Sequence, residues 1–207
     1  MLISNLITHK SELLTVKPTD LISKALEVIN KNNLLSIPVI DDDKYYGYIS
    51  KEIIFSFQFE KNIDKKSLIS DFKVEELMKS DLPIASPWDG VEQVVSYLEH
   101  KHIPFVPIIG KYDSFNGIVT HHAVFHQFNE IFGVNKGEKL SVVAFDIPGQ
   151  ISKISRIISE NNGDILSFVV IDPKTAIDVK EIVVRLVSED FDKIVKEIKK
   201  AGFQVQD

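Results

Sequence analysis

The sequence predicts an α/β (α+β) chain in which a β-α-β-β-α unit is used twice and a β-α-β-β-α-β unit follows. Two observations lead to this prediction. Residues 1–129 contain an internal repeat, in which apolar and turn residues return at a constant spacing. After Lys139 the order of apolar runs changes, which indicates a second type of domain.

The repeat keeps a spacing of 69 residues through its first part, since Pro18 recurs as Pro87 and Pro38 as Pro107. The other paired positions are Asp20, Ile22, Ala25, Leu26 and Ile29 with Asp89, Val91, Val94, Val95 and Leu98. After one inserted residue, Gly47-Tyr48-Ile49-Ser50 recurs as Gly117-Ile118-Val119-Thr120. Two packed copies are expected to form two related clefts, which is where a ligand site is expected.

In the first copy, Pro18 ends a short strand, and a helix is expected from about Thr19 or Asp20 because apolar residues follow at helical spacing. An acidic turn at 41–44 separates two later strands, and a second helix follows them. The expected strands are Leu13–Val16, Ser36–Ile40 and Tyr45–Ser50, and the second helix is Lys51–Phe59.

The second copy repeats this order, with strands expected at Phe105–Ile108 and Gly117–Thr120. Asp89 and Glu92 are spaced like a capping box, which predicts that a helix begins there. Residues 130–137 lose the helical periodicity and contain two glycines, which indicates a domain boundary. The predicted bounds are 1–59 for the first repeat, 60–73 for a charged connector, 74–129 for the second repeat, 130–137 for a linker and 138–207 for the C-terminal domain.

The C-terminal region predicts the β-α-β-β-α-β order of ferredoxin-like domains. Its strands are expected at Leu140–Phe145, Asp164–Ile171, Val179–Val187 and Phe203–Val205. Its helices are marked by Ile151, Ile154, Ile157 and Ile158, and then by Ile194, Val195 and Ile198. Asn161, Asn162 and Gly163 are typical of a helix C-terminus and are expected to end the first helix.

Composition limits the function. The 207 residues contain no cysteine and carry a formal net charge of −6, which excludes disulfides and makes a duplex-DNA or RNA partner a poor expectation. No apolar run is long enough to span a bilayer, and the first residues lack a basic leader, so we expect a cytoplasmic protein with no membrane partner.

These residues resemble two known families. The N-terminal region is similar to a tandem pair of CBS domains, a Bateman module, and the C-terminal region is similar to an ACT domain. The CBS-like motifs are Thr15-Val16-x-Pro18, Ile37-Pro38-Val39 and Gly47-Tyr48-Ile49-Ser50, with Val106-Pro107-Ile108 and Gly117-Ile118-Val119-Thr120 in the second copy. The ACT-like motifs are Asp146-x-Pro148-Gly149 and Asn162-Gly163-Asp164-Ile165. The combined layout resembles acetoin-utilisation-type proteins and small bacterial proteins that sense cyclic di-AMP (c-di-AMP).

The CBS resemblance implies an adenine-nucleotide site between the repeats. Apolar strand residues such as Val16, Ile37, Ile84 and Val106 would sandwich the adenine ring, and backbone groups near the prolines would read its edge. Ser50 and Thr120 precede helices, so a hydroxyl and a helix N-terminus can together hold a phosphate. The expected nucleotide-binding residues are Thr15, Val16, Ile37, Pro38, Ser50, Lys51, Ile84, Ala85, Val106, Pro107, Thr120, His121 and His122.

The chain departs from the family's ribose-binding pattern, because Ile53 and Ala123 stand where that pattern has an aspartate. A ligand whose ribose oxygens are held in phosphodiester links needs this aspartate less. We therefore expect c-di-AMP as the regulatory ligand and no cofactor, with the second copy as the better site. The alternative is that one or both clefts bind nothing.

The ACT resemblance implies that Pro148, Gly149 and Gln150 form a small-ligand site, often for an amino acid, or a dimer interface. The simpler alternative is that Gly149 only permits a tight turn. His122 and His126 have a spacing that suits zinc, yet no cysteine or H-E-x-x-H pattern completes a site, so we expect no metal. No catalytic set appears, and we expect no enzyme.

Together these features predict a non-enzymatic, homodimeric ligand sensor that relays nucleotide binding to an unidentified protein target. One alternative is a constitutive dimeric scaffold, joined through its ACT domains, with vestigial CBS sites. Another is an acetoin-utilisation-type regulator that binds AMP or ATP.

Overall fold

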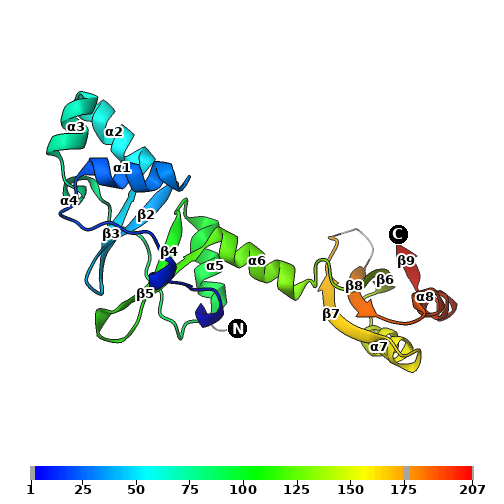
Figure 1. Cartoon of the computed structure of the whole chain (residues 1–207). Coiled ribbons are helices and arrows are strands. Elements are labelled where there is room, and N and C mark those ends of the chain that lie inside the picture. The colour runs from blue at the N-terminus through cyan, green and yellow to red at the C-terminus, as the bar shows by residue number, and fades with distance from the viewer. Residues whose placement is uncertain (1–2, 175–177, 207) are drawn as a thin grey trace. The chain divides into compact units, whose positions relative to one another are not determined.

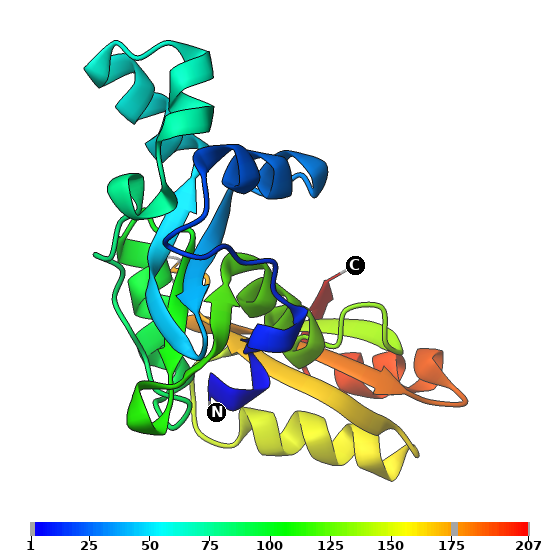
Figure 2. The ribbon, with the colours of Figure 1, turned by 60° about the vertical axis from the view of Figure 1, so that its left-hand side comes forward.

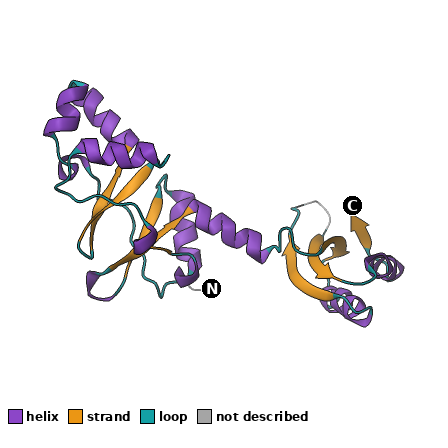
Figure 3. Ribbon diagram, viewed as in Figure 1, coloured by secondary structure: helices purple, strands orange, loops and turns teal. Residues whose placement is uncertain are grey.

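The computed structural model describes residues 3–174 and 178–206, and it divides into two compact units, Met1–Phe125 and His126–Asp207. Both units combine helices with β-sheets, which confirms the predicted α/β class (Figure 3). Helix α6 (His121–Ile131) crosses the division, so the predicted linker at 130–137 begins inside its last turn. Among the described residues, no helix is both long and apolar enough to cross a membrane.

The first unit contains the predicted repeat. In the first copy, β2 (Ser36–Asp41) and β3 (Lys44–Ser50) form an antiparallel pair that α1 (Ile22–Lys31) and α2 (Lys51–Lys61) accompany (Figure 1). In the second copy, β4 (Phe105–Ile109) and β5 (Phe115–Thr120) form the equivalent pair, with α5 (Val91–His100) and the start of α6.

Three local predictions were wrong. The expected strand Leu13–Val16 is reduced to one parallel bridge between Val16 and Val39, because only Val16 forms strand hydrogen bonds there. Helix α1 begins at Ile22 and not near Thr19, since Asp20 uses its carboxylate to accept the Lys17 N–H, at 2.8 Å, in the preceding turn.

The third error concerns the start of α5 and repeats the first-copy pattern. Asp89 accepts the Ser86 N–H at 2.7 Å and does not cap the helix, whose N-cap is Gly90. Residues 60–73, expected as a surface connector with helical character, contain α3 (Lys65–Asp71), and α4 (Val74–Leu77) follows.

The two copies exchange the segments that precede them. Strand β1 (Thr8–His9), before the first copy, pairs antiparallel with β5 of the second copy, Thr8 opposite Ile118 and His9 opposite Gly117. Lys79, before the second copy, pairs antiparallel with Tyr48 in β3 of the first copy. Three short 3₁₀ turns complete the unit: η1 (Ile3–Asn5), η2 (Lys10–Glu12) and η3 (Lys111–Asp113).

Each copy has its own apolar core, and a third cluster lies between them. Ile22, Ile29 and Ile54 are fully buried in the first core, and Val94 and Ile108 in the second. The third cluster contains Leu82, Phe105, Phe115 and Ile118, against which Tyr45 and Tyr48 pack. This aromatic cluster joins the two copies directly, so the copies form one packed body.

The second unit is the predicted ferredoxin-like sheet with two helices. Its strands are β6 (Glu138–Phe145), β7 (Asp164–Ile171), β8 (Val179–Val187) and β9 (Gln204–Gln206). They lie in the order β7-β8-β6-β9, and every pairing is antiparallel. Helices α7 (Gln150–Glu160) and α8 (Phe191–Lys200), drawn in Figure 2, belong to this unit. Isoleucines of both helices are buried in the apolar core that they form with the sheet.

Two glycines make the exchanged pairings possible. A Cβ at Gly47 would overlap the Lys79 carbonyl oxygen, and one at Gly117 would overlap the Thr8 carbonyl oxygen. Both glycines also have positive φ, at 159° and 151°. We expect Gly47→Ala and Gly117→Ala each to lower the free energy of unfolding by about 1–3 kcal/mol, measured by urea denaturation. Gly90→Ala, where φ is negative, is the control, and an equal loss there would contradict this explanation.

Tyr45 offers a second test of the cluster between the copies. Its ring stacks on Phe115 with centroids 5.6 Å apart, while its buried hydroxyl has no hydrogen-bond partner among the described residues. Burial raises the pKa of Tyr45, with smaller contributions from Tyr48 and the Asp81 charge. Tyr45→Phe keeps the stacking and removes the unsatisfied hydroxyl, so it should stabilise the fold by about 1 kcal/mol at neutral pH.

The same variant should change the alkaline pH dependence. A raised pKa keeps the phenol protonated in the folded state, so its contribution to stability is complete below about pH 10 and is lost as the pH rises further. Tyr45→Phe should therefore lose less stability above that pH than wild type, and the fully exposed Tyr112→Phe should not differ from wild type. Equal alkaline losses in all three proteins would contradict the assignment.

Candidate ligand-binding cleft

A cleft of about 830 Å³ opens in the first unit, where the first copy meets the segment leading into the second. Clefts of this size are typical of small-molecule sites. The first copy contributes Leu35, Ser36, Tyr48, Ser50, Lys51, Glu52, Ile53, Ser56, Phe57 and Glu60. The segment that leads into the second copy and the residues between α5 and β4 contribute Glu76, Leu77, Lys79, Asp81, Leu82, His102, Ile103 and Pro104.

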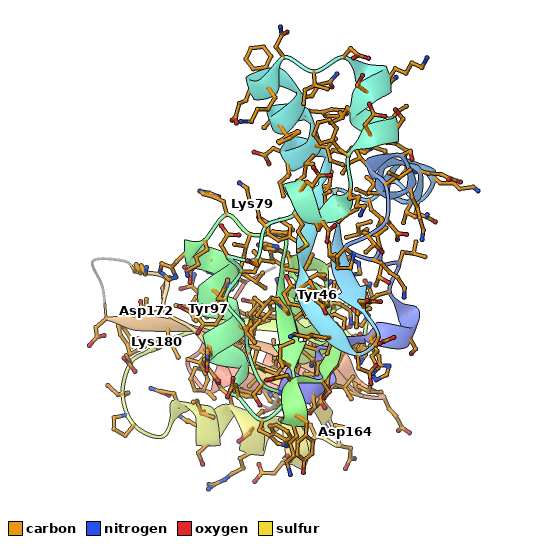
Figure 4. The ribbon with its side chains drawn as sticks, turned by 90° about the vertical axis from the view of Figure 1, so that its left-hand side faces the viewer. Tyr46, Lys79, Tyr97, Asp164, Asp172 and Lys180 are labelled. Carbon is orange, nitrogen blue, oxygen red and sulfur yellow. The ribbon has the colours of Figure 1, made fainter. Side chains whose placement is uncertain are left out.

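Strand pairing places the central polar residues of the cleft together. Tyr48 and Lys79 exchange two backbone hydrogen bonds, of 2.8 and 3.0 Å, so their side chains lie on the same face. Ser50 is two residues along β3 from Tyr48 and shares that face, and Ser36 lies directly opposite Ser50. Figure 4 labels Lys79 on the segment that leads toward the second copy.

The N-terminus of α2 lies at this cleft. The Ser50 hydroxyl caps the helix by accepting the Ile53 N–H at 3.1 Å, and the Lys51 N–H donates to the Leu35 carbonyl at 3.2 Å. The hydroxyl proton of Ser50 stays available to donate to an anion. The positive end of the helix dipole and the Lys51 ammonium add to this, so the corner suits a phosphate or carboxylate.

Aromatic and aliphatic side chains form the apolar part of the cleft. The Tyr48 ring packs edge-on against Phe105, with centroids 6.0 Å apart. Phe57 is held similarly by Phe72, at 5.4 Å. Leu35 is 80% exposed at the cleft, although it is a large apolar residue. A planar base can pack on such surfaces while its polar groups meet the serines and charges.

The carboxylates of Asp81 and Glu52 act on the Tyr48 hydroxyl. Burial raises the pKa of Tyr48, and the carboxylates of Asp81 and Glu52 raise it further because they disfavour the phenolate. The hydroxyl therefore stays protonated and can donate a hydrogen bond.

Of the residues predicted for the nucleotide site, Ser50 and Lys51 line this cleft. Val16, Ile37 and Val106, three of the four residues expected to sandwich adenine, do not line it. Each is at most 2% exposed because its side chain fills an apolar core. Pro38, Ala85 and Pro107 are likewise buried. Only backbone groups of these residues are left to meet a ligand.

Thr15 and Val16 border a separate, more open depression beside the charged residues Lys17, Asp20 and Lys24. Ion pairs already engage these charges, since Lys17 contacts Asp41 at 2.7 Å and Lys24 contacts Asp20 at 2.8 Å. The hydrogen bonds and charge of Asp41 raise the pKa of Lys17 accordingly. Ile84, at the position equivalent to Thr15, is 53% exposed.

The second copy repeats the helix cap but not the cleft lining. Thr120 accepts the Ala123 N–H at 3.2 Å, as Ser50 does for Ile53. The His121 ring bonds to the Leu98 carbonyl at 3.3 Å, so it joins α6 to the end of α5, and His122 is exposed. Within the described part of the chain, no group of three or more histidine or acidic residues is arranged to hold a metal ion.

Pro148, Gly149 and Gln150, predicted for the second unit, lie together at a cavity of about 340 Å³ between the end of β6 and the start of α7. Gly149 has a φ of 93°, and a side chain there would meet no atom within 4 Å. Lys180 closes one side and contacts Asp172 at 3.2 Å and Asp146 at 3.3 Å; Figure 4 shows Lys180 beside Asp172. The hydrogen bonds of Asp172 and then Asp146 raise the pKa of Lys180.

Sequence reasoning missed Lys79, Asp81 and Leu35 as residues of the main cleft. One sequence signal could have indicated the segment of Lys79. A Cβ at Gly47 would overlap the Lys79 carbonyl oxygen, so the glycine at this position indicates that another backbone segment passes close to β3. Leu35 lies just before the predicted strand, at the position equivalent to Pro104, and both residues line the cleft. Nothing in the local sequence distinguishes Asp81 from an ordinary surface carboxylate.

Comparison with known proteins fits this architecture. Residues 3–60 match the CBS domain family. CbpB of Listeria monocytogenes, solved in complex with c-di-AMP, is 29% identical with a TM-score of 0.55, over 61% of this chain and 94% of that one. A hypothetical conserved protein of Geobacillus kaustophilus is 26% identical with a TM-score of 0.57, over 62% and 96%.

CBSX2 of Arabidopsis thaliana, solved in complex with AMP, shares the fold at 21% identity and a TM-score of 0.54, over 63% of this chain and 97% of that one. Residues 3–60 therefore match the CBS domain model, and the fold of the first unit is similar to the folds of CBS-pair proteins.

Proposed function

We propose that the first unit is a non-enzymatic sensor that binds an adenine nucleotide, with c-di-AMP as the favoured ligand, and relays its binding to a protein partner. The main observation in support is the cleft at the N-terminus of α2, which is lined by residues of the first copy and by residues that lead into the second. The similarity to CbpB, solved with c-di-AMP, supports the choice of ligand. We assign the site to the first copy, because the cleft lies there.

In this proposal the phosphates lie between Lys51 and Lys79, near the Ser50 hydroxyl. Both lysines line the cleft, and within the described residues neither forms an ion pair with a carboxylate. The base packs against Tyr48 and the apolar side chains Leu35 and Ile103. Ile53, where a ribose-binding aspartate would stand, is 9% exposed and offers the ligand no acceptor.

We propose that the second unit is an ACT domain and that it mediates homodimerisation. Its cavity at Pro148, Gly149 and Gln150 is then the place for a small ligand such as an amino acid. The second candidate function is a constitutive dimeric scaffold without a nucleotide. The burial of Val16, Ile37 and Val106 favours this alternative, because three of the four side chains expected to sandwich the adenine fill apolar cores, and only Ile84 is exposed.

Nucleotide binding by the purified full chain tests the proposal. AMP, ADP, ATP, S-adenosylmethionine and c-di-AMP are compared by thermal shift and isothermal titration calorimetry. At 100 times its dissociation constant, a ligand should stabilise the fold by about 2.7 kcal/mol. Stabilisation by c-di-AMP is the expected result, and the absence of a shift and of heat with all five ligands would contradict the sensor.

Variants then locate the site. Lys51→Ala and Lys79→Ala should each weaken c-di-AMP binding by about tenfold or more, since each removes a charge-assisted contact to phosphate. Lys61→Ala, at the far end of the same helix, is the matched control and should leave the affinity unchanged. Thr120→Ala tests the second copy, and we expect no change there. Loss of binding in Thr120→Ala alone would move the site to α6.

A further inference from the structure

Negative charges outnumber positive charges in the cleft. Its lining includes the carboxylates of Glu52, Glu60, Glu76 and Asp81, against the ammonium groups of Lys51 and Lys79 and the imidazole of His102. The Glu76 carboxylate is occupied, because it accepts the Lys73 N–H at 2.7 Å at the start of α4. Among the described residues, Glu52, Glu60 and Asp81 form no ion pair. Three free carboxylates therefore face any ligand that enters.

Two of these carboxylates accompany the lysines. Glu52 follows Lys51 directly in the first turn of α2, and Asp81 is two residues after Lys79. Both act on one point of the cleft, because the charges of Asp81 and Glu52 both disfavour ionisation of the Tyr48 hydroxyl. The positively charged part of the cleft, at Lys51 and Lys79, is thus small. One anionic group of a ligand can lie close to these lysines, and further negative charge on that group then comes close to Glu52 or Asp81.

We propose that Glu52 and Asp81 make the cleft selective for nucleotides whose phosphates are in diester links, and that they exclude nucleotides with terminal phosphate groups. This inference rests on the proposed nucleotide site. A terminal phosphate monoester carries a charge of about −1.5 to −2 at neutral pH, whereas a diester has no second proton to lose. Because like charges repel, the carboxylates penalise the doubly charged terminal phosphate of AMP or ATP more than either singly charged diester of a cyclic dinucleotide.

Neutralising both carboxylates tests this selectivity. Glu52→Gln combined with Asp81→Asn keeps the size of each side chain and removes two negative charges. Glu27→Gln combined with Glu99→Gln is the control, since it changes the net charge from −6 to −4 equally, at exposed positions outside the cleft. Dissociation constants for c-di-AMP, AMP and ATP are measured by calorimetry without magnesium, on the full chain.

The cleft variant should bind ATP about tenfold or more tightly than wild type, and its affinity for c-di-AMP should change by less than about threefold. The control should bind each nucleotide as wild type does. If wild type binds c-di-AMP and the cleft variant gains no ATP affinity, the selectivity is overturned and the sensor stands. An equal ATP gain in the control also overturns it, because the effect would then come from net charge.

Failure of the proposed c-di-AMP sensor can be distinguished from failure of the proposed selectivity. If wild type binds none of the nucleotides and the cleft variant alone binds ATP, the c-di-AMP sensor is overturned, while exclusion by the carboxylates is supported. If neither protein binds any nucleotide, both proposals are overturned. Circular dichroism and the unfolding midpoint of each variant show whether a loss of binding reflects a loss of fold.

Discussion

The segment before each repeat pairs with the last strand of the other repeat, and the rest of the first unit depends on this exchange. The two contacts, Thr8–His9 with β5 and Lys79 with Tyr48, are only one or two residues long. Each crosses a glycine that cannot carry a side chain. Because the exchange bridges the copies at both ends, it holds the aromatic cluster of Tyr45, Tyr48, Phe105 and Phe115 closed.

The same contact builds the cleft. Lys79 belongs to the segment that leads into the second copy, yet its pairing places its side chain beside Tyr48, on the face that also carries Ser50. A residue far along the chain is thereby added to the N-terminus of α2. The site therefore has no sequence signature of its own, because half of it depends on a tertiary pairing.

This explains which predictions succeeded. The positions of α1, α5 and α7, though not the starts of α1 and α5, followed from apolar residues at helical spacing, and the β-α-β-β-α-β element order of the second unit followed from the succession of apolar runs. Ser50 and Lys51 could be placed at a cleft because a hydroxyl before a helix is a local signal. Strand β1 could not be found, since a two-residue strand such as Thr8–His9 has no periodicity to detect.

The buried valines and isoleucines show the limit of the repeat as a guide. A duplicated apolar residue is equally consistent with a core position and with a ligand contact, and the repeat alone does not separate them. In the structure, Val16, Ile37 and Val106 are buried in the apolar cores of the two copies. For Lys79 and Asp81 the error was in the other direction. A charged residue in an irregular segment is usually exposed to solvent without a function, so nothing in the sequence indicated that these two residues line a cleft.

The two copies share a backbone but differ in the side chains at the start of the helix that follows the last strand. Both helices begin with the same cap, from Ser50 to Ile53 and from Thr120 to Ala123. In the second copy, His121 is drawn to the Leu98 carbonyl, so a group that could meet an anion instead fastens two helices. The helix cap is therefore the same in both copies, and the copies differ in the residue that follows it, which is Lys51 in the first copy and His121 in the second.

The two lysines of the cleft, Lys51 and Lys79, differ in their surroundings from the lysines near the first copy's N-terminal segment. Lys10, Lys17 and Lys24 contact aspartates at 2.6–2.8 Å. Lys51 and Lys79 have carboxylates one or two residues away, yet among the described residues they form no ion pair. An unpaired cation beside unpaired anions contributes little to the stability of the fold, because surface pairs are weak even when formed. The more open depression at Thr15 differs from the cleft in this respect, because Lys17 and Lys24 there are already paired with aspartates, whereas Lys51 and Lys79 in the cleft have no such contact among the described residues.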